Sequence, residues 1–190
     1  MKIVITHGTK GSPLGNWFPW LGNALKDCGH TVTIPSYPTP ERQDLTTWLS
    51  AFDNEFGFSN LNSDTILIGH SLGVAFTLRV LQEAKESVRA CFFVAGFIRV
   101  LGIPEYDELN RSFISSSFDW SRLRAQAGLV HVYHSENDPY VPLKFGEEIA
   151  AALGVKINLI PGGGHLNSES GMAEFPRLLT DLKSVLNKAK

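Results

Sequence analysis

Short runs of apolar residues recur along the chain at lengths typical of β-strands. Most are continuous and do not alternate with polar residues, which favours strands that are covered on both faces. The predicted strands span residues 2–6, 31–35, 65–68, 90–95, 129–134 and 156–160. Between them lie segments whose apolar positions recur every three or four residues, a pattern that predicts amphipathic helices. These helices span residues 17–27, 44–56, 72–84, 143–153 and 174–186.

Strands that alternate with helices predict a single-domain α/β fold with a mostly parallel sheet of about six strands and helices on both faces. No internal repeat, low-complexity tract or linker divides the 190 residues. In sheets of this kind, ligands bind beyond the carboxyl ends of the strands. The loops that follow strands are therefore the places to look for functional residues.

Residues 97–127 interrupt the alternation, because they are rich in aromatic residues and serine but have no single period. The segment is much longer than the usual connection of about 4–6 residues, and long ordered loops often act as lids. We expect a partial cap in which Tyr106, Phe113, Phe118 and Trp120 form a pocket wall. The alternative is an ordinary crossover whose aromatic side chains pack on the sheet.

Composition and charge exclude several classes of function. Hydrophobic residues make up 43% of the chain, and 17 Lys and Arg against 19 Asp and Glu give a net charge of −2. No basic surface is available to bind nucleic acid. The apolar run 90–98 is too short to cross a membrane, and the N-terminal residues lack the features of a signal peptide. We therefore expect a cytoplasmic protein with no membrane partner.

The strongest chemical motif is Gly69-His70-Ser71-Leu72-Gly73, which fits G-x-S-x-G. A predicted strand precedes it and a helical pattern follows at once, as in a nucleophile elbow. Glycine is needed because so tight a turn brings neighbouring backbone too close for a Cβ atom. The turn projects the serine hydroxyl above the sheet. The alternative interpretation is a serine that caps the helix N-terminus.

A serine nucleophile needs a base and an acidic residue that orients the base. On this fold the expected chain order is Ser, then Asp or Glu, then His. His165 follows the sixth predicted strand, and Asp138 follows the fifth, 67 residues after Ser71 and 27 before His165. The predicted catalytic residues are therefore Ser71, Asp138 and His165. Glu136, in the same loop as Asp138, is the alternative acid.

Acyl transfer also needs donors for the oxyanion, which we assign to the backbone N–H groups of Leu72 and Thr9, with Lys10 as the next choice. The remaining lining of the pocket is assigned to histidine and aromatic side chains near these loops. They are His7, Trp17, His70, Phe113, Phe118 and Trp120. The alternative for Trp17 is that it anchors the first helix.

No cofactor is expected. His131 and His134 are three residues apart on a strand, so their side chains point to opposite faces and cannot chelate one metal ion. Two cysteines, Cys28 and Cys91, are too few for a cysteine-rich metal site. Lys10 precedes Gly11 and does not follow a G-x-x-x-x-G run, which argues against a phosphate-binding loop.

Several segments resemble a family of small serine hydrolases typified by retinoblastoma-binding protein nine and the YdeN-like bacterial proteins. The similar segments are His7-Gly8, residues 16–20, residues 69–73, Phe118-Asp119-Trp120, residues 137–142 and Gly164-His165. The resemblance implies hydrolysis of small acyl esters or amides, and it places the catalytic residues at Ser71, Asp138 and His165. Neither cysteine lies in a Leu-x-Cys-x-Glu segment, so binding to retinoblastoma protein is not expected.

The sequence thus predicts a carboxylesterase-type serine hydrolase that acts on a small-molecule acyl substrate through an acyl-enzyme. Its activity should fall at acidic pH as His165 takes up a proton. One alternative is a non-catalytic binding protein on a hydrolase scaffold, because fold does not determine function. A thioesterase or an acyltransferase would use the same three residues. Turnover of matched oxygen esters, thioesters and amides distinguishes these activities.

Overall fold

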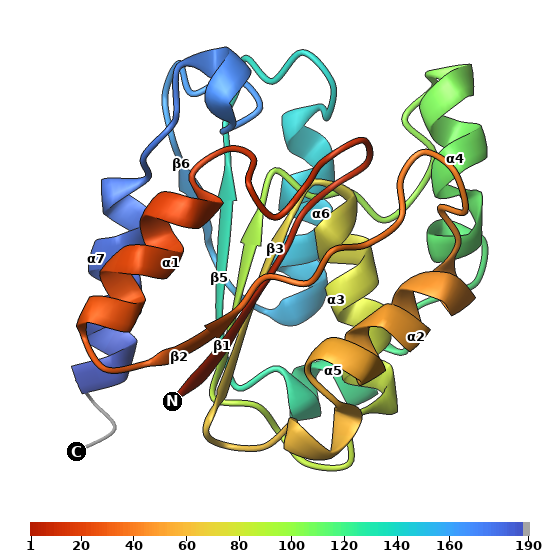
Figure 1. Ribbon diagram of the computed structural model, residues 1–190. Coiled ribbons are helices and arrows are strands. Elements are labelled where there is room, and N and C mark those ends of the chain that lie inside the picture. The colour runs from red at the N-terminus through yellow and green to blue at the C-terminus, as the bar shows by residue number, and fades with distance from the viewer. Residues whose placement is uncertain (188–190) are drawn as a thin grey trace.

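Six parallel strands form the central sheet of the computed structural model, which describes residues 1–187 (Figure 1). The strands are β1 (Lys2–Thr6), β2 (Thr31–Thr33), β3 (Thr65–His70), β4 (Ala90–Val94), β5 (Leu129–His134) and β6 (Ile157–Leu159). Their order across the sheet is β2-β1-β3-β4-β5-β6, and every neighbouring pair is parallel. The carboxyl ends of all six strands therefore lie along one edge of the sheet.

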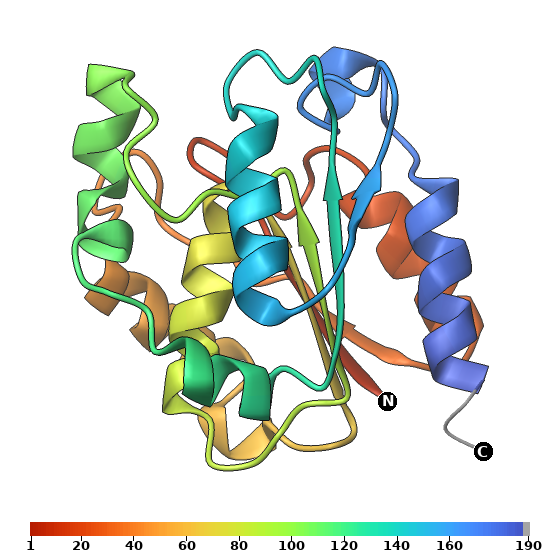
Figure 2. The ribbon, with the colours of Figure 1, turned by 180° about the vertical axis from the view of Figure 1, so that it is seen from behind.

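Helices cover both faces of the sheet. They are α1 (Phe18–Asp27), α2 (Leu45–Glu55), α3 (Leu72–Glu83), α4 (Pro104–Ile114), α5 (Trp120–Gln126), α6 (Leu143–Leu153) and α7 (Pro176–Asn187). Helices α1 and α7 lie on one face, and the other helices lie on the opposite side (Figures 1 and 2). The prediction of a single-domain α/β fold with a parallel sheet between helical layers is confirmed.

Burial on both faces explains why the strands are continuously apolar. Ile3 and Ile5 of β1 pack in a core cluster with residues of α1 and α7. Val4, between them, belongs to the second cluster, which includes residues of α2, α3 and α6. In β3, Ile66 and Leu67 divide between the two clusters in the same way. Alternate side chains of one strand thus enter different cores.

The two edge strands are shorter than the sequence predicts. β2 and β6 each contain three residues, whereas the apolar runs predict 31–35 and 156–160. Each has a single neighbour, and β2 pairs with β1 only over the three positions from Thr31 to Thr33. The apolar runs continue past the last paired residues because Ile34 and Ile160 still pack against the core cluster that includes α1 and α7. The five predicted helices are present, with ends that shift by at most two residues.

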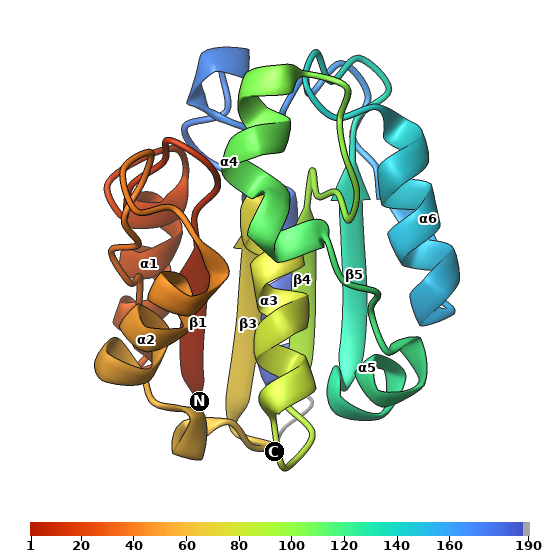
Figure 3. The same cartoon turned by 90° about the vertical axis from the view of Figure 1, so that its right-hand side faces the viewer.

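Residues 97–127 form two helices that the sequence did not predict, because the segment has no dominant period. Helix α4 crosses in front of the sheet near the carboxyl ends of the strands, where α3 begins (Figure 3). Helix α5 lies at the opposite end of the sheet, beside the start of β5. The part of this segment up to the end of α4 is therefore close to the edge where a site is expected, and α5 is not.

Helix α3 approaches β1 so closely that one position in its first turn must be glycine. A Cβ atom on Gly73 would lie 2.5 Å from the carbonyl oxygen of Thr6 and 2.7 Å from that of His7. Gly73→Ala should therefore lower the free energy of unfolding by about 3 kcal/mol, because backbone must move to admit the methyl group. Chemical denaturation measures the change.

Gly154→Ala is the matched control. Gly154 ends α6 with a φ of +72°, and no neighbouring atom lies within 4 Å of its added Cβ position. Alanine there meets only the backbone cost of the left-handed conformation, about 1–2 kcal/mol. An equal loss of stability in both variants would show that close approach is not the constraint at Gly73.

Candidate active site

Ser71 lies on a strained turn between β3 and α3. Its φ and ψ are +56° and −123°, a backbone conformation that costs free energy in a residue with a side chain. Its N–H donates to the carbonyl oxygen of Val94 at 2.9 Å, which ties the turn to the end of β4. Ser71 occupies the N-cap position of α3, but its side chain makes no capping bond. The hydroxyl group is therefore not used to begin the helix.

Glycines surround this turn for steric reasons. A Cβ atom on Gly69 would lie 2.6 Å from the carbonyl oxygen of Gly73, so the strand and the helix touch backbone to backbone. A Cβ atom on Gly8 would lie 2.7 Å from the Cβ atom of Ser71. The loop after β1 thus passes directly against Ser71, in agreement with the reason for the motif inferred from the sequence.

Asp138 and His165 form a buried hydrogen bond. His165 Nδ1 donates to Asp138 Oδ2 at 2.8 Å, and the side chains are 8% and 0% exposed, respectively. Asp138 Oδ1 accepts the backbone N–H groups of Tyr140 and Val141, both at 2.9 Å. Burial alone raises the pKa of the Asp138 carboxyl, but the hydrogen bond and attraction from His165, with these two N–H groups, hold it below its usual range.

The alternative acid, Glu136, does not contact the imidazole of His165. Its Oε1 instead accepts the N–H of Gly162 at 3.0 Å, and its side chain is exposed. The structure thus pairs Asp138, and not Glu136, with His165. Both carboxylates come from the loop after β5, but they point to different parts of the loop after β6.

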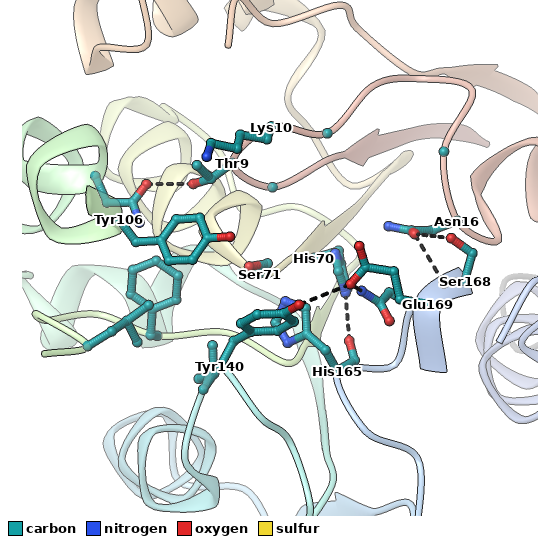
Figure 4. Close-up of a pocket in the computed structure, with 18 of the residues that line it drawn as sticks. Thr9, Lys10, Asn16, His70, Ser71, Tyr106, Tyr140, His165, Ser168 and Glu169 are labelled. Carbon is teal, nitrogen blue, oxygen red and sulfur yellow. Dashed lines mark hydrogen bonds between the residues drawn. The ribbon is translucent and has the colours of Figure 1, made fainter. Parts of the chain in front are cut away.

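Ser71 and His165 line a cavity of about 320 Å³ at the carboxyl edge of the sheet. Figure 4 shows Ser71 between the side chains of Tyr106 and His165. The other lining residues come from the end of β3, from the loops after β1, β4, β5 and β6 and from α4. They include Gly8, Thr9, Lys10, Asn16, His70, Phe97, Leu101, Tyr106, Asn110, Tyr140, Val141, Asn167, Ser168 and Glu169.

His70 and Trp17 hold the loop that carries His165. His70 Nε2 donates to the carbonyl oxygen of His165 at 3.0 Å, and Trp17 Nε1 donates to that of Leu166 at 2.9 Å. His70 also lines the cavity, whereas Trp17 is fully buried and does not. The expected placement of Trp17 in the pocket wall is therefore wrong. Trp17 acts as an anchor, as in the alternative, but its indole N–H holds the loop after β6.

The same loop is also held through its own N–H groups. Gly164 N–H donates to Asn137 Oδ1 at 2.9 Å, and His165 N–H donates to Ser170 Oγ at 3.0 Å. Donors and acceptors along the backbone of this loop are therefore paired on both sides of His165. These bonds keep the imidazole at a defined position.

His7 is fully buried and lies behind the loop after β1, away from the cavity. Its Nδ1 donates to the carbonyl oxygen of Gly8 at 2.8 Å, and its Nε2 accepts the N–H of Tyr37 at 3.2 Å. Burial lowers the pKa of His7, although the bond to Gly8 partly opposes this effect. The neutral ring therefore supports the loop, and the expected role of His7 in the pocket wall is wrong.

Three predicted wall residues pack in the core or against it instead. Phe113 is fully buried with its ring edge-on to Trp48, at a centroid distance of 5.0 Å. The Phe118 ring lies 3.7 Å below the Arg79 guanidinium, and Trp120 packs beside it where the chain enters α5. These aromatic residues behave as the alternative interpretation describes, in which the segment is an ordinary crossover with aromatic side chains that pack inward. The cavity receives Tyr106 and Asn110 from α4 in their place.

Tyr140 is a lining residue that the sequence did not single out as part of the pocket. Its ring packs edge-on against His165 at 5.2 Å and against Tyr106 at 6.3 Å, and its hydroxyl donates to Glu169 Oε2 at 3.1 Å. The side chains of Tyr140, Tyr106 and Glu169 are grouped around Ser71 in Figure 4. Its position two residues after Asp138 is the signal that could have identified it.

Metal-binding geometry is not found in the part of the chain that the structure describes: no three His, Cys, Asp or Glu side chains group closely enough to hold an ion. The His131 ring stacks on Phe92, whereas His134 packs against Gly146 of α6, on the other face of the sheet. Among residues 1–187, no helix is long and apolar enough to cross a membrane.

The parallel sheet, with a strained serine turn at its carboxyl edge, is that of the α/β-hydrolases. The chain belongs to the serine hydrolase family, because a sequence model of that family matches residues 3–184. It is 28% identical over 189 residues to the putative hydrolase YdeN of Bacillus subtilis (strain 168), covering 98% of this chain and 97% of that protein. The resemblance inferred from sequence motifs is thereby confirmed.

Two further similarities extend over nearly the whole chain. Serine hydrolase RBBP9 of Rattus norvegicus is 26% identical over 191 residues, covering 99% of this chain and 97% of that protein. The crystal structure of the ydeN gene product from B. subtilis superposes with a TM-score of 0.89 at 27% identity, covering 98% of each chain. Family membership supports hydrolase activity for this protein.

The neutral state of His70 predicts acid sensitivity of the fold. Burial, with smaller effects from nearby charged groups, lowers the pKa of His70 to about 3. Below the pKa of an unfolded histidine, about 6.5, the unfolded chain binds a proton that the folded chain does not. The free energy of unfolding therefore decreases as the pH is lowered. Between pH 7 and pH 4.5 the wild type should lose about 2–3 kcal/mol more unfolding free energy than His70→Gln.

Urea denaturation of both proteins at the two pH values provides the measurement. The glutamine amide can still donate to the carbonyl oxygen of His165, so the comparison isolates titration from loss of the bond. His7 and His134 are buried with lowered pKa values and remain in both proteins, so their contribution cancels. Parallel pH profiles for the two proteins would contradict a neutral His70.

Proposed function

We propose that the protein is a carboxylesterase-type serine hydrolase with Ser71 as nucleophile, His165 as general base and Asp138 as the residue that orients the base. One observation carries the proposal: Ser71, on its strained turn, shares a cavity with an imidazole whose Nδ1 is bonded to a buried carboxylate. This is the arrangement that activates a serine hydroxyl.

The hydrogen bond to Asp138 determines which nitrogen of His165 can act as a base. Because Nδ1 carries the proton that Asp138 accepts, the lone pair of the neutral ring is on Nε2. Nε2 takes the Ser71 proton as Oγ bonds to the ester carbonyl carbon, and the carbonyl π electrons move to oxygen. When the tetrahedral intermediate collapses, the alkoxide leaves with that proton. Water then attacks the acyl-enzyme by the same steps and regenerates Ser71.

Leu72 and Thr9 are proposed as the backbone donors to the oxyanion. Leu72 begins α3, where the positive end of the helix dipole favours negative charge. Within residues 1–187, neither N–H group donates a hydrogen bond to another protein group. The Lys10 N–H, the next choice from the sequence, already donates to Thr39 Oγ1 at 2.7 Å. Thr9 is therefore preferred over Lys10.

The size of the cavity favours a small acyl group. Its volume of about 320 Å³ is near the lower limit for small-molecule sites, about 300–1,000 Å³. Apolar atoms of Phe97, Leu101 and Val141 share the lining with polar groups from the loops. Esters with short acyl chains fit this space better than long-chain lipids.

An activated serine should react with a small fluorophosphonate. We expect the wild type to gain the mass of one phosphonyl group per chain, as measured by intact-mass spectrometry. Ser71→Ala should remain unmodified, because Ser71 carries the hydroxyl on the strained turn, whereas the Ser168 hydroxyl donates to Asn16 Oδ1. Ser168→Ala, which removes another serine that lines the cavity, should label like the wild type. A folded wild type that does not label would favour the alternative of a binding protein.

The assignment of the acid is tested by a pair of isosteric substitutions in one loop. Asp138→Asn should lower kcat by about 10³–10⁴-fold, because the amide no longer holds His165 in the required tautomer. Glu136→Gln should change kcat by less than about threefold, since the amide oxygen can still accept the Gly162 N–H. Ester turnover measures both. A larger loss in Glu136→Gln would contradict the assignment.

The pH dependence of the wild type tests His165 as the base. A protonated imidazole has no lone pair for the serine proton, so kcat/KM should fall as the pH is lowered. Asp138 stays ionised over this range because its pKa is lowered. A kcat/KM that is independent of pH between 5 and 8 would exclude His165 from this role.

A further inference from the structure

A buried amide network joins the loop after β1 to helix α4. Thr9 Oγ1 donates to Asn110 Oδ1 at 2.6 Å, a bond drawn from Thr9 as a dashed line in Figure 4. Gln43 Nε2 donates to the same oxygen at 2.9 Å and also to the carbonyl oxygen of Leu109 at 3.1 Å. Asn110 is 1% exposed and Gln43 is 8% exposed.

The network also holds the next residue of the loop. Lys10 N–H donates to Thr39 Oγ1, and the Thr39 hydroxyl donates to Gln43 Oε1. Gln43 Nε2 lies 3.3 Å from Thr9 Oγ1 as well. One glutamine side chain therefore connects, directly or through Thr39, with Thr9, Lys10 and α4.

Little else fixes the position of Thr9. Gly8 precedes it and offers no side chain, and a backbone bond from Gly11 N–H to the Gly8 carbonyl oxygen closes the turn locally. Lys10, which follows it, is held by its bond to Thr39 and by an exposed ion pair with Glu105. His7 supports only the first residue of the loop, through the Gly8 carbonyl oxygen. The side chain of Thr9 is thus the buried link between Thr9 itself and α4.

A buried asparagine in a helix is costly unless its polar atoms serve a purpose. Asparagine is a poor helix former, and burial of an amide costs free energy unless it is hydrogen-bonded. A leucine would pack at this position on α4 without these costs. Asn110 Oδ1 accepts two donors, and both belong to residues that hold the loop after β1. The amide of Asn110 therefore stabilises the position of that loop and does not stabilise helix α4.

We propose that Asn110 of α4 is a positioning residue that sets the place of the Thr9 backbone N–H, and hence of the oxyanion, through the Thr9 hydroxyl. The proposal rests on the oxyanion role of Thr9 in the proposed function. Displacement of a catalytic group by about 1 Å can cost 100-fold in rate. The α4 segment is thereby part of the catalytic apparatus without touching the substrate's reacting atoms.

Three variants test the link: Thr9→Val, Asn110→Leu and the double variant. Each single variant should lower kcat for a short-chain ester by about 10- to 100-fold, expressed per folded chain, with KM within about twofold. Because both substitutions break the same bond, the double variant should be no more than about threefold slower than the slower single variant. Thr9→Val retains the backbone N–H and the shape of the side chain and removes only the hydroxyl.

Glu105→Gln is the matched control. It breaks the exposed ion pair between Lys10 and Glu105, which joins the same loop to the same helix outside the buried network. Surface ion pairs contribute little to stability, so kcat should stay within about twofold of the wild type. A loss as large as that of Asn110→Leu would mean that any attachment of α4 matters, which would overturn a specific role for the amide.

Other outcomes also overturn the proposal. They are a Thr9→Val kcat within about twofold of the wild type, losses that multiply in the double variant, or a rise in KM with unchanged kcat. If Asn110→Leu does not fold, the Thr9→Val result decides. Fluorophosphonate labelling of the wild type distinguishes failure of the proposed function from failure of the positioning role. If the wild type does not label, the proposed function fails. If it labels normally and the variants keep their kcat, only the positioning role of Asn110 fails.

Discussion

The backbone of β1 and the first turn of α3 lie in contact, and the rest of the site depends on that contact. Gly73 is the position where a Cβ atom would separate these two elements, Gly69 allows the same approach between β3 and α3, and Gly8 allows it between the loop after β1 and Ser71. With no side chains between them, the turn at Ser71 stays in a conformation that costs free energy on its own. The surrounding packing holds this strain and keeps the hydroxyl group at the cavity. A serine in a relaxed loop would have no such constraint on its direction.

Around this contact, neutral donors hold the neighbouring loops by their backbone oxygens. His7 donates to Gly8, His70 to His165 and Trp17 to Leu166. All three donors are buried, where a charged group would incur a large desolvation cost. An imidazole or an indole supplies a directed N–H group without that cost. All three residues were predicted to line the pocket: His70 does so, whereas His7 and Trp17 are buried and hold the loops in place.

Periodicity and motif spacing were sufficient to predict the sheet, the helices on both faces, and the meeting of the loops after β3, β5 and β6. These features depend on local pattern and on chain order, which a sequence displays directly. The partners of Trp17 and Asn110 could not be predicted, because each bonds to a group about 100 or more residues away. Phe113 was misplaced for a related reason: the segment 97–127 lacks a period, so the buried side of α4 could not be inferred. Aromatic composition alone does not distinguish a pocket wall from a core.

Around His165, the loop after β6 is held largely through its main-chain atoms, with the Ser170 hydroxyl as an exception, so its geometry depends little on most of its side chains. The carbonyl oxygens of His165 and Leu166 and the N–H of Gly164 remain whatever residues evolution places beyond them. Ser168 and Glu169 line the cavity from this same loop. They can therefore diversify among relatives, or in a laboratory library, while the imidazole keeps its place. A scaffold of this kind can change what it recognises and retain the same chemistry.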